Sequence, residues 1–522
     1  MLGTLDAPGL VAGTNGEGDV NMATESESTR PAAGLSTDVS SREREAVEAF
    51  GYHQDLRRTL RFFALFGVSF SVISITTGIF LNYGVGIDNW GPASIWLWLI
   101  VGVGQLLVAL VVAELGTRIP LAGYAYQWSS RLVNSTYGWF VGFAGLMFMT
   151  IGGGAIMLLA ASPLLISEFG NDAPSQHLVL AVAIILMVLP VVVNVVSVQL
   201  TARINTIAVV TEIVGTLVFG VLLLVLWGLK TKPTDHGLGF LTDTTQLVHH
   251  PTWYAIVLAS LLGAYTLVGF ELAADMAEES VNARLDVPRA VVFAVVGAVV
   301  VGFIALIGFT VAIPNLPAIQ KSPLPLIDIG QYWLPGWLVK VFVGLVVFSM
   351  FAINVIGTAA QGRLVYSMSR DNMLPFSRFF RRVNPRTQTP IVALVTFGIL
   401  NIVVMYYGYL QTNAFSTLVG SSAIIPYIIY FLITIAYAMK RRVMERIPGA
   451  FSLGRFAPVV IGSVLVWTVA IICSLSLPGE FHNADKVILG AAVLAFLWYV
   501  LALRRRLRSG DAGVRPIEEM LS

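Results

Sequence analysis

The feature that most limits the fold of this chain is a series of twelve long apolar runs. A run of about 20 apolar residues is long enough to cross the roughly 30 Å hydrocarbon core of a bilayer. Only 12% of the residues are charged, against about a quarter in soluble domains. The sequence therefore predicts an all-α polytopic membrane protein with twelve transmembrane helices. The predicted spans are 62–86, 93–115, 138–166, 178–199, 206–229, 253–277, 289–313, 336–362, 390–409, 414–438, 457–477 and 486–503.

Lys and Arg are distributed unevenly between alternate loops. If the N-terminus is cytoplasmic, about 23 of them fall in cytoplasmic loops and chain ends and about 5 in the outer loops. Positive charge in membrane proteins accumulates on the cytoplasmic side. We therefore expect a multi-pass protein of the plasma membrane with both termini in the cytoplasm.

The segments outside the spans are polar. Residues 1–50 are rich in Gly, Ser, Thr and acidic residues, and predict a disordered cytoplasmic tail. A capping box at Ser40 predicts a short surface helix, Met22 is a second candidate start, and no cleaved signal is expected. The transporter-like domain spans 51–505, and 506–522 form a cytoplasmic C-terminal tail.

Two spans carry residues that interrupt helices. The first contains "SVISITTGIF" (Ser71–Phe80) and the sixth "LLGAYTLVGFELAADMAEE" (Leu261–Glu279). A non-helical break in a bilayer persists only where it lines a cavity or meets a ligand, because unpaired backbone groups there cost several kcal/mol. The N–H groups of a half-helix suit an anion and freed carbonyls suit an ammonium group, so a small zwitterion would satisfy both. Alternatively, Ser and Thr bond to the preceding turn and Gly packs against a neighbouring helix.

The positions of these two spans suggest an internal repeat. Irregular first and sixth helices fit two five-helix repeats of inverted topology, about 62–229 and 253–438, with two extra helices at about 457–503.

Four motifs carry a family resemblance. "TTGIF" (Thr76–Phe80) resembles the first-helix break of the amino acid, polyamine and organocation permease superfamily, although Thr76 stands where that pattern usually has a glycine. "VGFELAADMAEESVNARLDVPRA" (Val268–Ala290) resembles its sixth-helix signature. "AELGTRIPLAGYAYQW" (Ala113–Trp128) and "RLVYSMSRDNMLP" (Arg363–Pro375) resemble two of its loop motifs.

The resemblance implies the leucine-transporter fold, with a 5+5 inverted repeat and broken helices 1 and 6. "GYHQDLRRTL" before the first span resembles the amino acid and choline transporter branch, which includes bidirectional amino acid transporters and GABA permeases.

The resemblance also implies site residues at the first break. The backbone around Thr76, Thr77 and Gly78 would hold a substrate carboxylate, with the Thr hydroxyls as further donors. A carbonyl near Ser74 would accept from the substrate amine.

At the sixth span, carbonyls near Tyr265 and Thr266 would also accept from the amine. Tyr265 falls where the family has an aromatic gate, four residues before Gly269. Glu271 is expected to support the break by hydrogen-bonding exposed amides.

Glu212, in the fifth span, is the proton-coupling candidate. An ionised carboxylate there costs about 2.5–3.5 kcal/mol, and holding it protonated at pH 7 costs about 3.7 kcal/mol. Because the two costs are close, such a group can load and release a proton. The alternative is a structural role, in which Asn205 and a Thr satisfy Glu212. A sodium-coupled version would instead use hydroxyls of the eighth span, which offers Ser349, Asn354 and Thr358.

The charges that follow the sixth span are predicted to lie in a cytoplasmic loop. Glu278, Glu279 and Arg289 are loop charges that form an inner gate with Arg363 or Arg370, or else an ordinary solvated ion-pair face. The glycines at 152–154 are interpreted as a packing run.

The function predicted is a secondary active transporter that moves amino acids or amino-acid-like amines such as GABA by alternating access, with the proton as the coupling ion. Alternatives are a choline or polyamine permease, a sodium symporter and a nutrient receptor that does not transport. An enzyme is not expected, because HExxH, CxxC, P-loop and Rossmann patterns do not occur. No cofactor, metal or nucleic acid is expected; the partners are the substrate and the bilayer.

Overall fold

The computed structural model describes residues 48, 50–52, 58–171, 173–234, 236–411 and 413–521. The predicted tail, 1–50, and the predicted surface helix near Ser40 lie almost wholly outside these residues. Over the described part, the chain is helical apart from connecting segments and one isolated β-bridge between Leu60 and Ser280.

Eleven helices of the described residues are long and apolar enough to cross a membrane. They coincide with eleven of the twelve predicted spans. They are α2 (Phe62–Ile73) with α3 (Ile75–Trp90), α4 (Ile95–Arg118), α6 (Ser135–Ile156) with α7 (Ser162–Glu168), α8 (Gln176–Val196), α9 (Val198–Gly228), α12 (Ala283–Val311), α15 (Gly336–Arg370), α17 (Ile391–Tyr409), α18 (Ala414–Met444), α19 (Ala457–Ser476) and α20 (His482–Trp498) with α21 (Arg504–Ser509).

Shorter helices connect the long ones. π-helical turns at Met157–Ala161 and Tyr499–Leu503 join α6 to α7 and α20 to α21. Further short α-helices are α5 (Tyr124–Leu132), α13 (Leu316–Ile319), α14 (Pro325–Trp333) and α16 (Ser377–Phe380), and α22 (Ile517–Leu521) follows the last span.

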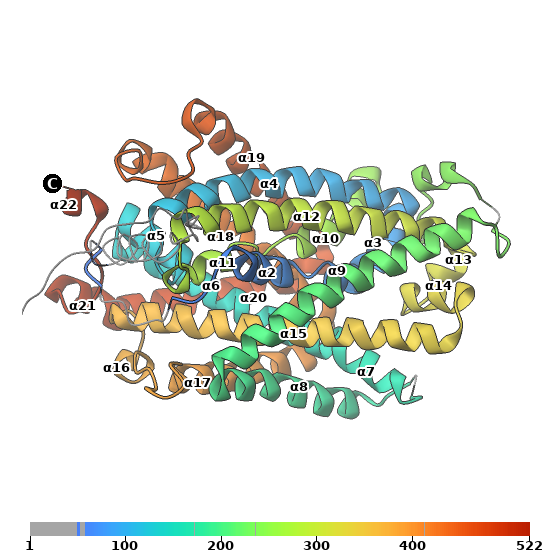
Figure 1. Ribbon diagram of the computed structural model, residues 1–522, viewed down its shortest axis with the longest axis horizontal. Coiled ribbons are helices and arrows are strands. Elements are labelled where there is room, and N and C mark those ends of the chain that lie inside the picture. Colours follow the sequence, from blue (N-terminus) through green and yellow to red (C-terminus); the bar gives the residue numbers. More distant parts are fainter. Residues whose placement is uncertain are drawn as a thin grey trace, which may run out of the picture.

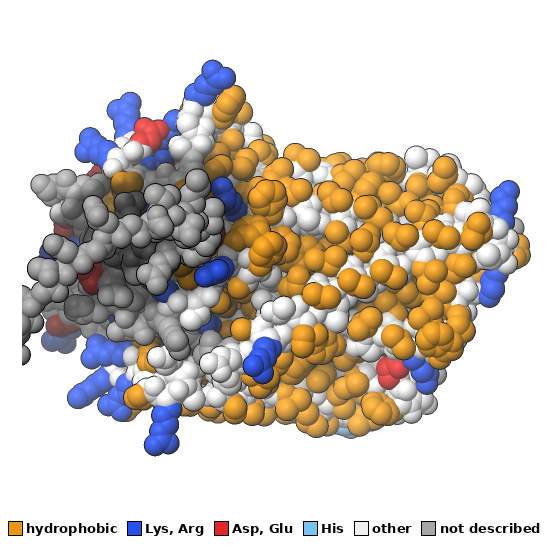
Figure 2. All heavy atoms as spheres, viewed as in Figure 1, with side chains coloured by type: hydrophobic (Ala, Val, Ile, Leu, Met, Phe, Trp, Pro, Cys, Tyr) orange, Lys and Arg blue, Asp and Glu red, His pale blue; other side chains and the backbone are white. Residues whose placement is uncertain are grey.

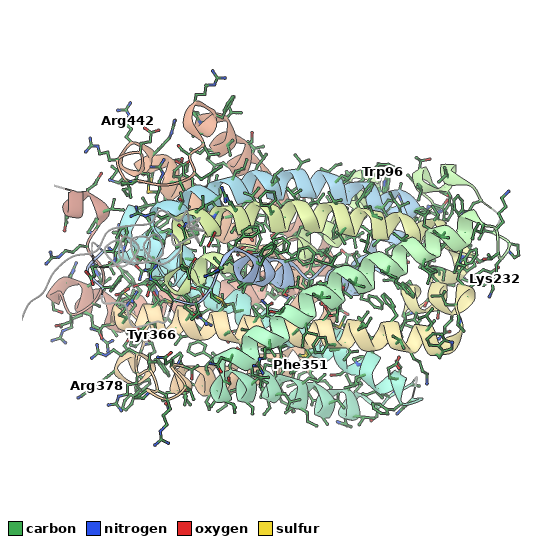
Figure 3. All side chains as sticks on the ribbon, viewed as in Figure 1. Trp96, Lys232, Phe351, Tyr366, Arg378 and Arg442 are labelled. Carbon is green, nitrogen blue, oxygen red and sulfur yellow. The ribbon has the colours of Figure 1, made fainter. Side chains whose placement is uncertain are left out.

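The long helices run side by side along the bundle (Figure 1). A broad apolar band covers the middle of the visible face, and Lys and Arg gather at the end that holds α5, α16 and α21 (Figure 2). We call this the basic end. Arg378 and Arg442 point outward there, whereas Lys232 lies at the opposite end (Figure 3). An apolar band between polar ends is the surface of a multi-pass membrane protein.

The first span is interrupted at a single residue. Ser74 separates α2 from α3 and has φ +41° and ψ 75°, a left-handed conformation. Its N–H donates to the Phe70 carbonyl (3.1 Å), and its own carbonyl accepts from the Gly78 N–H (3.0 Å). The break is therefore a sharp joint between two helices.

The sixth predicted span, 253–277, does not form one long helix. α10 (Thr252–Thr266) ends early, residues 267–271 are non-helical, and α11 (Leu272–Asp275) has four residues. Gly269 has φ +88°, and a Cβ there would lie 2.5 Å from Val72 Cγ1, so only glycine fits. At 15 residues α10 is about 22 Å long, too short to cross alone, so the twelfth crossing and the 5+5 repeat stay predictions.

The interrupted helices lie inside the bundle. α3 packs against α10, while α2 packs against α12, and α12 also contacts α4 and α9. α18 packs against α6 and α19. The main neighbour of α2 is thus α12 and that of α3 is α10, and both halves also contact α9 and α15, so their junction lies between packed helices.

Candidate functional site

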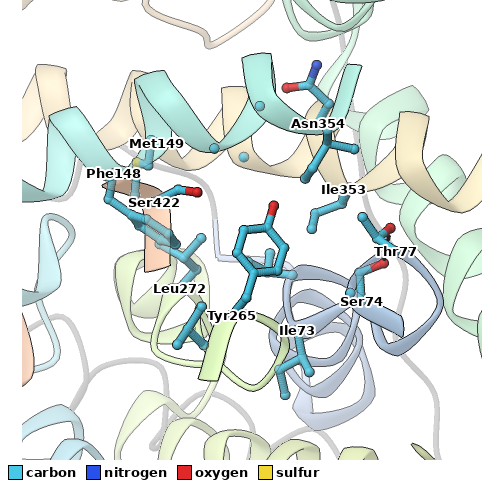
Figure 4. A pocket seen from close by; sticks show the side chains of 17 residues that line it. Ile73, Ser74, Thr77, Phe148, Met149, Tyr265, Leu272, Ile353, Asn354 and Ser422 are labelled. Carbon is cyan, nitrogen blue, oxygen red and sulfur yellow. Dashed lines mark hydrogen bonds between the residues drawn. The ribbon is translucent and has the colours of Figure 1, made fainter. Parts of the chain in front are cut away.

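A cavity of about 80 Å³ lies where the two interruptions meet (Figure 4). Five helical regions contribute to it: α2 and α3, α6, the segment from α10 to α11, α15 and α18. The lining residues are Val72, Ile73, Ser74, Thr77, Gly78, Phe148, Met149, Gly152, Gly153, Ile156, Tyr265, Val268, Leu272, Ile353, Asn354, Gly357 and Ser422.

The first break places three of the predicted site residues at the cavity. Ser74, Thr77 and Gly78 line it, and the Ser74 hydroxyl donates to Thr77 Oγ1 (2.6 Å). Gly78 allows α3 to approach α10, because a Cβ there would lie 2.1 Å from Thr266 Oγ1. The N–H groups of the first helical turn have no carbonyl of their own helix to bond, so the Thr77 amide belongs to a polar helix end at the cavity wall.

Two of the three amides expected to hold a carboxylate already have partners. The Gly78 N–H closes the first turn onto Ser74 (3.0 Å). The Thr76 N–H donates to Glu212 Oε1 (3.2 Å), and the Thr76 hydroxyl is hydrogen-bonded to Thr216. Thr76 itself does not line the cavity among the described residues. The polar groups left at this wall are thus centred on Thr77 and Ser74.

Glu212 reaches the break from α9 and is 2% exposed. The sequence suggested Asn205 as its structural partner, but the carboxyl contacts the first-helix backbone, and Asn205 Oδ1 is buried without a hydrogen-bond partner in the described chain. The proton-coupling candidate therefore touches the N-terminal turn of α3, and Thr77 and Gly78 of the same turn line the cavity.

The sixth break contributes Tyr265, Val268 and Leu272 to the lining. In Figure 4 the Tyr265 ring projects into the cavity, between Ser422 and the first-helix residues. Thr266 is directed at Gly78, and its hydroxyl donates to the Leu262 carbonyl (2.5 Å). Of the predicted residues here, the structure thus brings Tyr265 to the cavity.

Gly269 and Glu271 are joined through α18. The Gly269 N–H donates to the Tyr430 hydroxyl (3.3 Å), which donates to Glu271 Oε2 (2.7 Å). The Ser69 hydroxyl donates to the Phe270 carbonyl (2.5 Å). Glu271 is fully buried and outside the cavity lining. Side chains of α2 and α18 thus satisfy backbone groups that the break leaves without helical partners.

The opposite wall was not identified from sequence. It consists of Phe148, Met149, Gly152 and Gly153 on α6, residues 353, 354 and 357 on α15, and Ser422 on α18. These helices continue through the cavity region, so they carry no local break signal. Gly152 and Gly153 belong to the run interpreted as packing, and Asn354 was considered only as a sodium ligand.

The three sodium-ligand candidates on α15 lie in different surroundings. Asn354 lines the cavity, the Thr358 hydroxyl donates to the Asn354 carbonyl (2.8 Å), and the Ser349 hydroxyl is buried without a hydrogen-bond partner among the described residues. Sodium coupling stays a prediction.

Ion pairs join the segment after α11 to α15 at the basic end. Both Glu279 carboxylate oxygens accept from Arg363, and Arg370 Nη2 lies 3.1 Å from Glu278 Oε1. The Ala122 N–H also donates to Glu278 (3.0 Å). Arg289 belongs to no ion pair within the described residues, so the predicted cluster forms without it.

A segment before α2 covers these pairs. The Arg370 guanidinium lies 3.5 Å from the centre of the Tyr52 ring, and the Tyr52 hydroxyl donates to Asp371 (2.8 Å). Tyr126 donates to the other Asp371 oxygen (2.8 Å). Burial raises the pKa of the Asp371 carboxyl, while Arg370 and the tyrosine hydroxyls act in the opposite direction.

Comparison with known proteins identifies the family. The family model described as "Amino acid permease" matches residues 60–498. The amino-acid permease BAT1 of Arabidopsis thaliana is 25% identical over 91% of this chain and 96% of its own length. The GABA-specific permease of Saccharomyces cerevisiae is 22% identical over 85% and 80%, and the thiamine transporter thi9 of Schizosaccharomyces pombe is 22% identical over 85% and 83%. These relatives are transporters and not enzymes. The chain belongs to the amino acid permease family of the amino acid, polyamine and organocation superfamily.

Proposed function

We propose that the protein is a secondary active transporter that moves amino acids or amino-acid-like amines across the plasma membrane by alternating access. The observation that carries this proposal is the cavity bounded by both helix interruptions and lined by Ser74, Thr77 and Tyr265. Polar backbone at membrane depth is tolerated where it meets a cavity or ligand. The names of the relatives, amino-acid permease and GABA-specific permease, support this substrate class.

A zwitterion would bind with its two charges at different groups. Its carboxylate meets the N-terminal end of α3, at the Thr77 amide and the hydroxyls of Ser74 and Thr77, where the helix dipole favours negative charge. Its ammonium group meets backbone carbonyls at the end of α2 and near Tyr265. A quaternary ammonium would prefer an aromatic cage, and the described lining offers only Phe148 and Tyr265.

Glu212 couples a proton to this binding. The Glu212 carboxyl and the substrate carboxylate approach the same helix end, through Thr76 and Thr77 respectively. When Glu212 is ionised, the two negative charges repel and compete for one positive dipole end. When Glu212 is protonated, this repulsion is gone, so proton binding strengthens substrate binding. By linkage, substrate binding strengthens proton binding by the same factor.

The basic end is the cytoplasmic side in this proposal, as the distribution of Lys and Arg favours. The pairs of Glu279 with Arg363 and of Glu278 with Arg370 then close the cavity toward the cytoplasm.

Uptake of a labelled amino acid panel into proteoliposomes, with imposed proton or sodium gradients, tests the proposal. Glu212→Gln should abolish uptake driven by a pH gradient and leave exchange intact. Glu168→Gln, at the end of α7 and outside the cavity lining, is the control. Unchanged gradient-driven uptake in Glu212→Gln would refute proton coupling through this residue. If uptake strictly requires a sodium gradient, sodium and not the proton is the coupling ion. If no amino acid is transported at all, the alternative of a receptor that does not transport is left.

A further inference from the structure

The wall opposite the two breaks has an unusual composition. Three of its residues are glycines, Gly152 and Gly153 on α6 and Gly357 on α15, and none of the described lining residues is charged. We propose that this wall restricts the site to zwitterions with no net charge and a small uncharged side chain, and that Gly357 and Gly152 set the size limit. This inference rests on the proposed function and names the substrate class of the same site.

The charge restriction follows from the lining. Its polar side chains are Ser74, Thr77, Tyr265, Asn354 and Ser422, which are neutral groups. The helix ends provide one place for a carboxylate and one for an ammonium group. A third charge, as in a basic or acidic amino acid or a polyamine, would be desolvated with no opposite charge in the described lining, which is strongly unfavourable.

The size restriction follows from the volume. One buried water needs about 10–15 Å³ of cavity volume. A cavity of about 80 Å³ therefore holds several waters. That corresponds to a solute with a handful of non-hydrogen atoms, such as glycine, alanine or GABA. An aromatic amino acid does not fit without rearrangement of the walls.

Gly357 keeps this volume open. A Cβ at Gly357 would have no atom within 4 Å, and one at Gly152 would meet only Ser422 Cβ, at 3.9 Å. Neither glycine is required by close packing, although glycine costs about 1 kcal/mol relative to alanine inside a helix. A methyl group at either position would extend into the cavity. Gly153 differs, because a Cβ there would lie 2.6 Å from Asn354 Oδ1.

Competition for uptake tests both restrictions. Proteoliposomes holding the full chain take up labelled alanine in the presence of glycine, alanine, GABA, valine, phenylalanine, lysine or glutamate. For the unmodified protein, glycine, alanine and GABA should compete with labelled alanine for uptake. Phenylalanine, lysine and glutamate should be weaker competitors by at least about tenfold.

In Gly357→Ala, competition by alanine and GABA should weaken by at least about tenfold relative to competition by glycine. One methylene in a pocket changes discrimination between substrates by that order. Gly344→Ala is the matched control: it lies on the same helix, also has no atom within 4 Å of its Cβ, and is exposed on the outer surface. It should leave the order of competitors unchanged. Gly152→Ala makes the same test on α6 if Gly357→Ala does not fold.

The outcomes separate the two proposals. Lysine, glutamate or phenylalanine competing as well as alanine would overturn the restriction and leave the transporter function standing. The same holds if Gly357→Ala and Gly152→Ala, both folded, keep the order of the unmodified protein. Absence of uptake of every amino acid in the panel by the unmodified protein would overturn the proposed function, and this inference with it.

Discussion

Arg363 contacts both carboxylate oxygens of Glu279 at the basic end of the bundle, with Nη2 and Oε2 3.1 Å apart. The Glu279 carbonyl also accepts from the N–H groups of Thr59 and Leu60, at 2.9 and 3.0 Å. Glu279 thus links three parts of the chain: the segment that follows α11, helix α15 and the start of the first span. In the transport cycle that we propose, opening of the cavity at this end would separate these contacts.

Glu279→Gln should therefore favour opening at the basic end. Removing one partner of a fully buried ion pair costs about 3–5 kcal/mol. Because Arg363 and Glu279 keep 15% and 9% exposure, we expect a smaller shift, about 1.4 kcal/mol, which is tenfold in an equilibrium. In a Cys473→Ala background with Val72→Cys in the cavity wall, thiol labelling from the basic end should rise about tenfold. Glu445→Gln, in an exposed pair with Arg441, is the control, and an unchanged labelling rate contradicts the gate.

Gly78→Ala should disturb the contact between α3 and α10. The added methyl would lie 2.1–2.5 Å from Thr266 side-chain atoms, and overpacking of this kind costs about 1–3 kcal/mol. We expect a lower melting temperature and weaker substrate binding, both partly restored by Thr266→Gly. Gly84→Ala, on the same helix, is the control, since its nearest neighbour would be Pro325 at 3.4 Å. Failure of Thr266→Gly to restore either property would show that the clash is not the cause.

Thr77→Val tests the carboxylate site with little change in shape. It removes the hydroxyl that accepts from Ser74 and that we place on the substrate carboxylate. A hydrogen bond to a charged group contributes about 1.5–3 kcal/mol, so substrate affinity should fall more than tenfold. The melting temperature should also fall, because the buried Ser74 hydroxyl loses its acceptor, so affinity is measured at a temperature where the variant is folded. Thr206→Val, an exposed α9 residue, is the control. Unaltered affinity in Thr77→Val would remove this residue from the site.

Tyr430→Phe should weaken the sixth break. It removes the donor to Glu271 and the acceptor of the Gly269 N–H, and an unsatisfied buried group costs about 1–3 kcal/mol. The melting temperature should fall, and Glu271→Gln should alter it much less in the Tyr430→Phe background than in the unmodified protein. Additive effects of the two substitutions would argue against the contact. Tyr406→Phe, on the exposed surface of α17, is the control.

Asp371→Asn should change the pH dependence of stability. Since burial raises the pKa of the folded-state carboxyl above its ordinary value of 3.8, this group stabilises the fold most below that value, and the contribution is lost as the pH rises through the folded-state pKa. Asp371→Asn keeps one acceptor oxygen, and its NH2 group can donate to the second tyrosine hydroxyl. It should therefore raise the melting temperature at pH 7, with the difference shrinking toward a pH of about 4. Asp328→Asn, exposed on α14, should show no such trend.

The spans and both interruptions could be predicted because their signals are local. Apolar length marks a span, and Gly, Ser and Thr in "SVISITTGIF" or Gly269 mark a break. Eleven predicted spans have corresponding helices. The sixth differs because Gly269 adopts positive φ beside Val72, which shortens α10.

The contacts within the site could not be predicted, because they join residues far apart in sequence. Glu212 and Thr76 are 136 positions apart, and Gly269 and Tyr430 are 161 apart. The wall residues Gly357 and Ser422 sit in unbroken helices and give no local sign of facing a cavity. The sequence therefore located the breaks, but not the partners that occupy the Thr76 and Gly269 amides.

The one-residue interruption at Ser74 has a mechanical consequence. Each residue has only two soft torsions, and α2 and α3 stay hydrogen-bonded up to either side of Ser74. The angle between α2 and α3 can therefore change by rotation about the φ and ψ torsions of Ser74 alone. α2 then moves as a rigid body, and neither helix has to unfold.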